Sequence, residues 1–293
     1  MVFRPDSPVD LPNGRLGCGP HHLTICGICT VDYSFMDEIN NSEDEAMSDS
    51  DTGEYPNTFF PGVFRTADTP ASTSTAPVIP TKFDPPLASD TPQTLFPPGI
   101  STMAIPRVLR FLHATNTRQF LVYTDGACLD NGNTNPRAGC SFVFRPSTEH
   151  PEVRGYTRFR LENQGPTGEV HPQTSNRAEL RAVIAALRFR AWPGEGCNTL
   201  VIATDSEYVA EGATGWVRGW LRRGWKTSTG AAVKNQDLWK CLLEEIKVKK
   251  AHGLEVKFWR IPREWNTEAD RHAKHAASED AQDKFADIMG VLV

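Results

Sequence analysis

Two apolar runs that each end in Thr-Asp restrict the fold more than any other feature of the sequence. They are QFLVYTDGA at residues 119–127 and NTLVIATDSEYV at residues 198–209. An almost continuous apolar run of this length indicates a strand that is buried on both faces of a sheet. If the two strands are parallel neighbours, Asp125 and Asp205 leave the sheet at one edge, where α/β proteins hold their ligands.

The segments around these runs predict the remaining elements. Strand patterns occur at 138–145, 153–162 and 254–261, and helical patterns at 175–192, 235–250 and 266–277. Ser175 offers an N-cap to the first of these helices, and Pro193-Gly194 ends it. We therefore expect an α/β fold with a mixed five-stranded sheet flanked by helices, in which three antiparallel strands come first and parallel strands follow.

The composition changes at about residue 102. Residues 1–100 carry 4 Lys and Arg, 14 Asp and Glu, and 14 of the 22 prolines, whereas residues 101–293 have a formal net charge of +5. Because the acidic, Pro/Ser/Thr-rich part buries too little apolar surface to offset chain entropy, we expect a disordered linker at 37–101. A folded domain is predicted at 102–293, and its positive charge makes a polyanion a candidate partner.

The compartment is suggested by what the sequence lacks. The seven cysteines are scattered and do not resemble a disulfide framework. The N-terminus lacks the basic-then-apolar layout of a signal peptide, and no apolar run approaches the ~18–20 residues that span a bilayer. We therefore expect an intracellular protein, nuclear or cytoplasmic, with no signal peptide, no transmembrane segment and no membrane partner.

The motif CGPHHLTICGIC at residues 18–29 is a candidate zinc site within residues 1–36. Cys26 and Cys29 have the C-x₂-C spacing of a zinc knuckle, and Cys18 with His21 or His22 would complete four ligands to a structural Zn²⁺. The alternative is a set of free thiols in a mobile arm. The sequence leaves both open.

Two more carboxylates join Asp125 and Asp205 as candidates for one site. Glu179 lies within the otherwise apolar face of a predicted helix, and Asp270 is near the start of the last helix. Clustered carboxylates need cations, and ligands that are all oxygen suit Mg²⁺ or Mn²⁺ rather than Zn²⁺. A pair of such ions is a common device for phosphodiester hydrolysis. The alternative is four unrelated residues: a turn residue, a helix N-cap and two surface charges.

Five motifs that contain these carboxylates resemble those of the type 1 ribonuclease H family in its eukaryotic-like form. They are YTDGAC (123–128), QTSNRAEL (173–180), ATDSEYV (203–209), GWVRGWLRRGWKTSTG (215–230) and NTEADRHA (266–273). They occur in the order of the family and at its approximate spacings, over about residues 117–280. The resemblance implies a ribonuclease H-like catalytic domain that cleaves the RNA strand of RNA–DNA hybrids endonucleolytically, leaving 5′-phosphate and 3′-hydroxyl ends.

The resemblance also implies a role for each matching residue. The acids that bind two Mg²⁺ ions, for which Mn²⁺ can substitute, correspond to Asp125, Glu179, Asp205 and Asp270. The positions that contact the RNA strand correspond to Asn131, Ser175 and Asn176, and those that hold a phosphate of the DNA strand to Thr174 and Asn235. Only a 2′-hydroxyl distinguishes RNA from DNA at such contacts. Gly126 is expected to let a phosphate approach closely.

The fourth motif resembles the basic protrusion of the family. It mixes aromatic rings with cations, a combination suited to the sugar-phosphate backbone of a DNA strand. Its candidate contact residues are Trp216, Arg218, Trp220, Arg222, Arg223, Trp225 and Lys226. The alternative for Trp216 and Trp220, which are four residues apart, is a place in the helix core.

The sequence departs from the family pattern in two places. The loop PREWN at 262–266 is shorter than usual and lacks the His that the family commonly carries there, so Glu264 is the candidate substitute for proton transfer. Pro172 stands near the place of an Arg that commonly supports the phosphate pocket. The alternative function is therefore a catalytically impaired RNA–DNA hybrid-binding module.

The acidic N-terminal region shows no resemblance to the small hybrid-binding domain of many eukaryotic members. We expect a monomer in which this region either recruits a protein partner or occupies the basic groove as an intramolecular mimic of nucleic acid. The second alternative rests on the opposite net charges of the two parts of the chain, −10 over residues 1–100 and +5 over the remainder.

Overall fold

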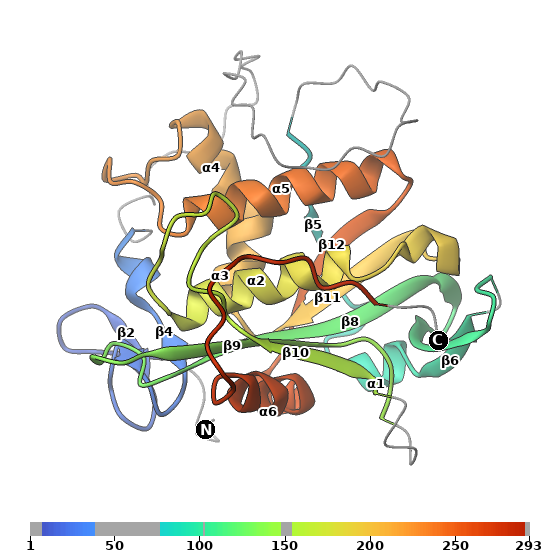
Figure 1. Cartoon of the computed structure of the whole chain (residues 1–293), viewed down its shortest axis with the longest axis horizontal. Helices are drawn as coiled ribbons and strands as arrows, with labels where there is room; N and C mark the ends of the chain where they lie inside the picture. The colour runs from blue at the N-terminus through green and yellow to red at the C-terminus, as the bar shows by residue number, and fades with distance from the viewer. Residues whose placement is uncertain (1–7, 39–76, 102, 148–153, 291–293) are drawn as a thin grey trace.

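In the computed structural model, which describes residues 8–38, 77–101, 103–147 and 154–290, the two strands predicted from the apolar runs lie side by side in one sheet (Figure 1). The five central strands, in spatial order, are β10 (Tyr156–Arg160), β9 (Arg137–Val143), β8 (Asn116–Leu129), β11 (Thr199–Thr204) and β12 (Glu255–Arg260). β10, β9 and β8 pair antiparallel, whereas β11 runs parallel to β8 and β12 runs parallel to β11. The predicted mixed α/β sheet is confirmed.

Residues 77–101 differ from the predicted disordered linker because they extend this sheet. Their elements are β5 (Thr81–Lys82), α1 (Pro92–Leu95) and β6 (Pro98–Ser101), and the strand that follows them is β7 (Val108–His113). β5 pairs with β12, and β6 pairs with β7, which pairs with β8. The rings of Phe83 and Phe96 lie 4.9 and 6.2 Å from that of Trp259. The average composition suggested that residues 77–101 bury too little apolar surface to become ordered. Burial of these aromatic rings offsets the loss of conformational entropy. Residues 39–76 of the predicted linker lie outside the described residues.

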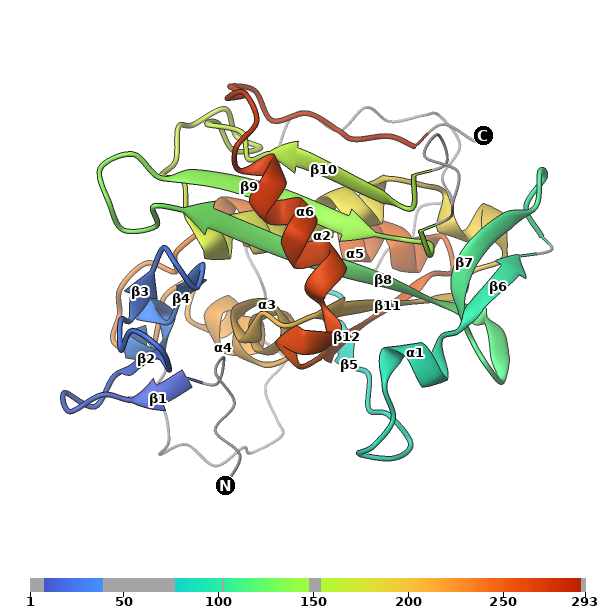
Figure 2. The ribbon, with the colours of Figure 1, turned by 90° about the horizontal axis from the view of Figure 1, so that it is seen from below.

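Helices cover both faces of the sheet (Figures 1 and 2). α2 (Ser175–Arg188) packs on β8 and β9, α5 (Gln236–Ala251) packs on α2 and β12, and α6 (Thr267–Ala276) packs on the opposite face against β8, β9 and β10. The shorter segments are η2 (Trp192–Glu195), α3 (Glu207–Glu211), the π-helical turn η3 (Gly212–Trp216), α4 (Val217–Arg222) and η4 (Arg263–Trp265). The main core lies between the sheet and α2, whose Leu180, Val183 and Ile184 are fully buried as their helical spacing predicted.

Two glycines let helices approach the sheet closely. A Cβ on Gly126 of β8 would lie 2.1 Å from the backbone nitrogen of Glu179 on α2. A Cβ on Gly139 of β9 would lie 2.2 Å from the backbone nitrogen of Ala277, just after α6. Both distances are far below van der Waals contact, so a side chain at either position would push a helix away from the sheet. Gly126 therefore sets how far Glu179 stands from β8.

The N-terminal segment (residues 8–38) folds beside the carboxyl end of β8 (Figure 2). Its elements are β1 (Pro8–Asp10), β2 (Leu16–Cys18), β3 (Ile25–Cys26), β4 (Val31–Asp32) and the 3₁₀ helix η1 (Ser34–Glu38). β1 pairs with β2 and β3 pairs with β4, both antiparallel. Nowhere in the part of the chain that the structure describes is a helix both long and apolar enough to cross a membrane.

Candidate active site

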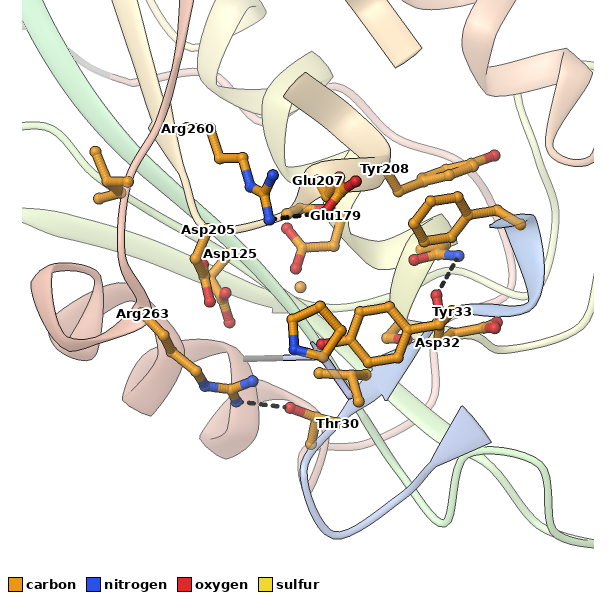
Figure 3. Close-up of a pocket in the computed structure, with 18 of the residues that line it drawn as sticks. Thr30, Asp32, Tyr33, Asp125, Glu179, Asp205, Glu207, Tyr208, Arg260 and Arg263 are labelled. Atoms are coloured by element: carbon orange, nitrogen blue, oxygen red, sulfur yellow. Dashed lines mark hydrogen bonds and ion pairs between the residues drawn. The ribbon is translucent and has the colours of Figure 1, made fainter. Parts of the chain in front are cut away.

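Three carboxylates converge at the carboxyl end of β11 (Figure 3). Asp125 lies inside β8, opposite Ser141 of β9, rather than at the end of its strand as the sequence predicted. Tyr123 of β8 pairs with Ala203 of β11, so Asp125 and Asp205, each two residues further on, lie at the same edge of the sheet. Glu179 reaches this edge from α2. One carboxylate oxygen from each of the three residues lies within 4.8 Å of the other two. The structure thus brings together three of the four acids that the sequence singled out.

The electrostatics of this cluster favour a bound cation. Burial raises the pKa of Asp125 well above its usual value, and the charges of Asp205 and Asp270 raise it further. Burial also raises the pKa of Glu179, with Asp125 and Asp205 as additional causes. Oε2 of Glu179 is buried and has no hydrogen-bond partner. A divalent cation would supply both the missing partner and the missing positive charge, so this oxygen-only donor set fits Mg²⁺.

Asn266 connects two of the acids, Asp205 and Asp125, with its side-chain amide 3.5 Å from Oδ1 of Asp125, and was missed by the sequence reasoning. Its side-chain amide donates to Oδ1 of Asp205 at 2.6 Å and to the carbonyl oxygen of Thr124 at 3.0 Å. The side chain is 1% exposed, at the residue that precedes α6. An Asn before a helix ordinarily indicates an N-cap, so nothing in the sequence showed that its amide would point into the site. The contact fixes the orientation of the Asp205 carboxylate.

Asp270 lies outside the tight cluster, although its charge acts on Asp125. Its two carboxylate oxygens accept hydrogen bonds from Arg263 and Lys274, both at 2.8 Å. Burial lowers the pKa of Arg263, but the charges of Asp205, Asp125 and Asp270 outweigh burial and raise it above its usual value. Arg263 therefore acts as a counter-ion to the acids. The sequence reasoning considered this loop only for Glu264 and missed Arg263.

The acids line a cavity of about 570 Å³, and the N-terminal segment forms one of its walls (Figure 3). Its other walls include α3, the end of β12 and the loop that carries Arg263 and Glu264. Arg260 at the end of β12 forms an ion pair with Glu207 of α3 at 2.7 Å. Thr30 and Tyr33 of the N-terminal segment also line the cavity. Glu264, the candidate substitute for the loop His of the family, therefore lies at the wall of this cavity.

The residues predicted to contact the RNA strand lie beside this cavity. The amide of Asn131, in the loop after β8, donates to the hydroxyl of Ser175 at 3.1 Å, and both side chains are buried. The amide of Asn176 donates to the carbonyl oxygen of Asp32 in the N-terminal segment at 3.2 Å. Ser175 is the first residue of α2, and Thr174, rather than the predicted Ser175, is the N-cap. These polar side chains thus form one row along the start of α2.

The predicted phosphate-binding residue Asn235 precedes α5 with a left-handed backbone, φ 54°. Its amide donates to the hydroxyl of Tyr208 at 3.2 Å. The same hydroxyl also accepts from the indole of Trp239 at 2.9 Å. Arg177, which the sequence reasoning did not select, makes a two-pronged ion pair with Asp237 at 2.9 and 2.6 Å. This pair joins the starts of α2 and α5, where Thr174 and Asn235 lie.

The Trp-rich motif divides between the core and the surface. Trp220 is 5% exposed and packs against Trp239, with ring centroids 5.2 Å apart, so its prediction as a nucleic-acid contact is corrected to the core alternative. Trp216 is half-buried, and Trp225 is half-buried with Lys240 5.4 Å above its ring. The exposed cations of the motif are Arg218, Arg222, Arg223 and Lys226. Helical spacing placed Trp220 on the inner face of α4, whereas the cations point outward.

The predicted zinc ligands also come together. One nitrogen of His21 and the sulfur atoms of Cys18, Cys26 and Cys29 all lie within 4.8 Å of one another. His21, rather than His22, supplies the nitrogen, which resolves the alternative that the sequence left open between them.

Comparison with known proteins finds relatives of the region that holds the acids. Residues 117–278 match the family model described as RNase H. The chain is 37% identical over 174 residues to Ribonuclease H of Treponema pallidum, covering 55% of this chain and 92% of that protein. It is 34% identical over 163 residues to Ribonuclease H1 of Homo sapiens, covering 54% of this chain and 50% of that protein. A crystal structure of LC9-RNase H1, a type 1 RNase H, is 30% identical with a TM-score of 0.39, over 54% of this chain and 72% of that one. The family match contains the three clustered acids and does not include the N-terminal segment.

Proposed function

Because the chain belongs to the RNase H family, we propose that it hydrolyses the RNA strand of RNA–DNA hybrids endonucleolytically. The observation that carries the proposal is the convergence of Asp125, Glu179 and Asp205 within 4.8 Å, together with the unpartnered buried oxygen of Glu179. Two buried acids with raised pKa values, Asp125 and Glu179, beside a third carboxylate cost stability unless a cation joins them. Acids with perturbed pKa values gather at functional sites, so a catalytic role explains why the fold retains this cluster.

The proposed metal ligands are Asp125, Glu179, Asp205 and Asp270. Bound Mg²⁺ or Mn²⁺ ions would supply an activated water and charge neutralisation at the leaving oxygen, which would give 5′-phosphate and 3′-hydroxyl ends. Asn266 orients Asp205 through its 2.6 Å hydrogen bond. Arg263 holds Asp270 at 2.8 Å and reduces the repulsion among the acids. These residues therefore prepare the cluster for cations before any substrate arrives.

The polar side chains at the start of α2 would distinguish the RNA strand from the DNA strand. Asn131, Ser175 and Asn176 can exchange hydrogen bonds with 2′-hydroxyls, which only the RNA strand carries. Thr174 and Asn235 would hold a phosphate of the DNA strand at the starts of α2 and α5. The exposed Arg222, Arg223 and Lys226 would contact the DNA backbone further along, and their contribution should weaken as salt rises.

A hybrid-binding module without catalysis is the second candidate, and one observation favours it. Asp270 is engaged by Arg263 and Lys274 instead of joining the other acids, so the fourth ligand is held away from the cluster. The two candidates predict the same binding but a different fate for the RNA strand.

Cleavage of a labelled hybrid by the full chain separates the candidates. The nuclease requires that the RNA strand is cut in Mg²⁺ and left intact in EDTA, and that Asp125→Asn abolishes cutting while hybrid binding persists. Glu244→Gln, at an exposed acid of α5, is the matched control and should cut normally. Intact RNA in both Mg²⁺ and Mn²⁺ would eliminate the nuclease, and full activity of Asp125→Asn would remove that residue from the metal site.

A further inference from the structure

A second cluster of metal-binding side chains lies in the N-terminal segment. Nδ1 of His21 lies 3.8 Å from Sγ of Cys18, 3.5 Å from Sγ of Cys26 and 3.2 Å from Sγ of Cys29. Tetrahedral zinc, with bonds of about 2.3 Å to sulfur and about 2.0 Å to nitrogen, places such atoms about 3.5 Å apart. The four side chains therefore already have the spacing of a Cys₃His zinc site.

The backbone around the cluster supports metal binding. The N–H of Cys29 donates to Sγ of Cys26 at 3.4 Å, a contact that stabilises a thiolate. The N–H of His22 donates to the carbonyl oxygen of Cys18 at 2.8 Å, which closes the turn that carries His21. All seven cysteines of the chain lie in the described residues, and none forms a disulfide. A segment of this length is too short to build its own core, so a metal is the expected source of its stability.

The segment that this cluster folds lies against the face assigned to the hybrid. The carbonyl oxygen of Asp32 accepts from the amide of Asn176 at 3.2 Å, and the hydroxyl of Ser34 accepts from Lys234 at 3.3 Å. The hydroxyl of Thr30 accepts from Arg263, the counter-ion of the acids, at 3.1 Å (Figure 3). These three contacts occupy donors at the start of α2, before α5 and next to the acids.

An aromatic contact and a close backbone contact also hold the N-terminal segment against this face. Phe35 is 3% exposed, and its ring lies 5.4 Å from those of both Tyr208 and Trp216. A Cβ on Gly27, between the zinc-ligand candidates Cys26 and Cys29, would lie 2.9 Å from the backbone nitrogen of Asn131. The turn of the candidate knuckle therefore rests directly on the loop that presents Asn131.

We propose that Cys18, His21, Cys26 and Cys29 bind one structural Zn²⁺, and that the N-terminal segment folded by this ion caps the hybrid-binding face and competes with the substrate. The zinc site stands on its own geometry, whereas the cap rests on the proposed function. The segment carries one Arg against four Asp and Glu, a formal net charge of −3, and three thiolates on Zn²⁺ add a further negative charge. An acidic segment would repel a phosphate backbone, so it is suited to replace the hybrid on this face rather than to bind it.

The metal content of the full chain tests the zinc site without any activity measurement. After expression with zinc and extensive dialysis, we expect about one zinc per chain by mass spectrometry of the metal. The double variant Cys26→Ser/Cys29→Ser should lose it, whereas Cys241→Ser, a half-buried thiol outside the cluster, should retain it. A wild-type chain without zinc, or a double variant that retains it, overturns the site.

The KM for the RNA–DNA hybrid tests whether the N-terminal segment acts as a cap. If about a tenth of the molecules are uncapped at any time, removing the cap lowers the KM about tenfold. We expect this decrease in Cys26→Ser/Cys29→Ser and in Phe35→Ala, which leaves the zinc ligands intact. Ile28→Ala is the matched control because Ile28 is 74% exposed in the same segment, and its KM should not change. An unchanged KM in Phe35→Ala overturns the cap, and a raised KM shows that the segment helps to bind the hybrid.

Hybrid binding in Ca²⁺ distinguishes failure of the cap from failure of the proposed function. Fluorescence anisotropy of a labelled hybrid gives the Kd of each variant whether or not the chain cleaves RNA. A tighter Kd in Phe35→Ala, together with intact RNA in separate Mg²⁺ and Mn²⁺ reactions, supports the cap and rejects the nuclease. If neither the wild-type chain nor the variants bind the hybrid, both the cap and the proposed function are rejected, and the zinc measurement stands alone.

Discussion

Replacing Gly126 with alanine should damage both the packing of α2 and the geometry of the acids. The added Cβ would lie 2.1 Å from the backbone nitrogen of Glu179 and 2.4 Å from the carbonyl carbon of Ala178. Ordinary contact requires about 3.4 Å, so β8 and α2 must separate by about 1 Å. Overpacking costs about 1–3 kcal/mol, and because both obstacles are backbone atoms we expect a loss of about 3 kcal/mol in the free energy of unfolding.

The same separation moves Glu179 away from Asp125 and Asp205. Metal–ligand distances tolerate changes of only about 0.2 Å, and a misplacement of about 1 Å can reduce a rate about 100-fold. We therefore expect the kcat of Gly126→Ala for hybrid cleavage to fall about 100-fold or more at a temperature well below its unfolding midpoint. The loss should exceed what the unfolded fraction of the variant explains.

Gly155→Ala is the matched control for this prediction. A Cβ there would lie 2.3 Å from the carbonyl oxygen of Arg145, an equally severe backbone clash, but Gly155 precedes the edge strand β10 and is not part of the cavity lining. Both variants should lower the unfolding temperature measured by circular dichroism, by about 6–12 °C for a loss of about 3 kcal/mol. Only Gly126→Ala should lower kcat per folded molecule. Wild-type kcat in Gly126→Ala, or an equal loss in both variants, would refute the reasoning.

Three further predictions concern ionisable residues away from the cluster or at its edge. Arg263→Met removes a counter-ion of the acids, so Mg²⁺ should raise the unfolding temperature more than in the wild type; equal increases in a Mg²⁺ titration would contradict this role. Glu162→Gln breaks a buried 2.7 Å ion pair with Arg181 and should cost about 3 kcal/mol in urea unfolding, whereas a loss below about 1 kcal/mol would count against it. Burial, with help from nearby cations, lowers the pKa of His272 from its usual value of 6.5 to about 4. Because the unfolded chain then binds the extra proton, His272 should lower stability by about 1–2 kcal/mol as pH falls from 6.5 towards 4. His272→Gln should reduce that loss, and an identical pH dependence of the two proteins would reject it.

Local patterns were sufficient for the elements that carry the acids. The apolar runs that end at Asp125 and Asp205 predicted two buried strands, and the structure pairs these strands in parallel. The helical spacing around Glu179 predicted α2, whose apolar residues are buried on the sheet. Periodicity succeeds here because each element is buried on a regular face, so the sequence of the element itself records its surroundings.

Contacts between distant segments were not predictable in the same way. Residues 77–101 have the composition of a linker, yet Phe83 and Phe96 pack on Trp259 and bring β5 to the edge of the sheet. Trp220 belongs to the core although its motif is rich in cations, because its side chain faces Trp239 on α5. In each case the deciding partner lies far away in the sequence.

The sequence by itself determined the class of fold, the two buried strands that carry or precede Asp125 and Asp205, and the three acids that cluster. Only the tertiary structure decided how those acids are held: Asn266 orients Asp205, Arg263 engages Asp270, and Gly126, expected to admit a phosphate, instead admits the backbone of α2. The tertiary structure also set the N-terminal segment beside the cavity. The reason is physical: the period of a strand or helix is a local property, whereas the direction of a polar side chain depends on which distant group satisfies it.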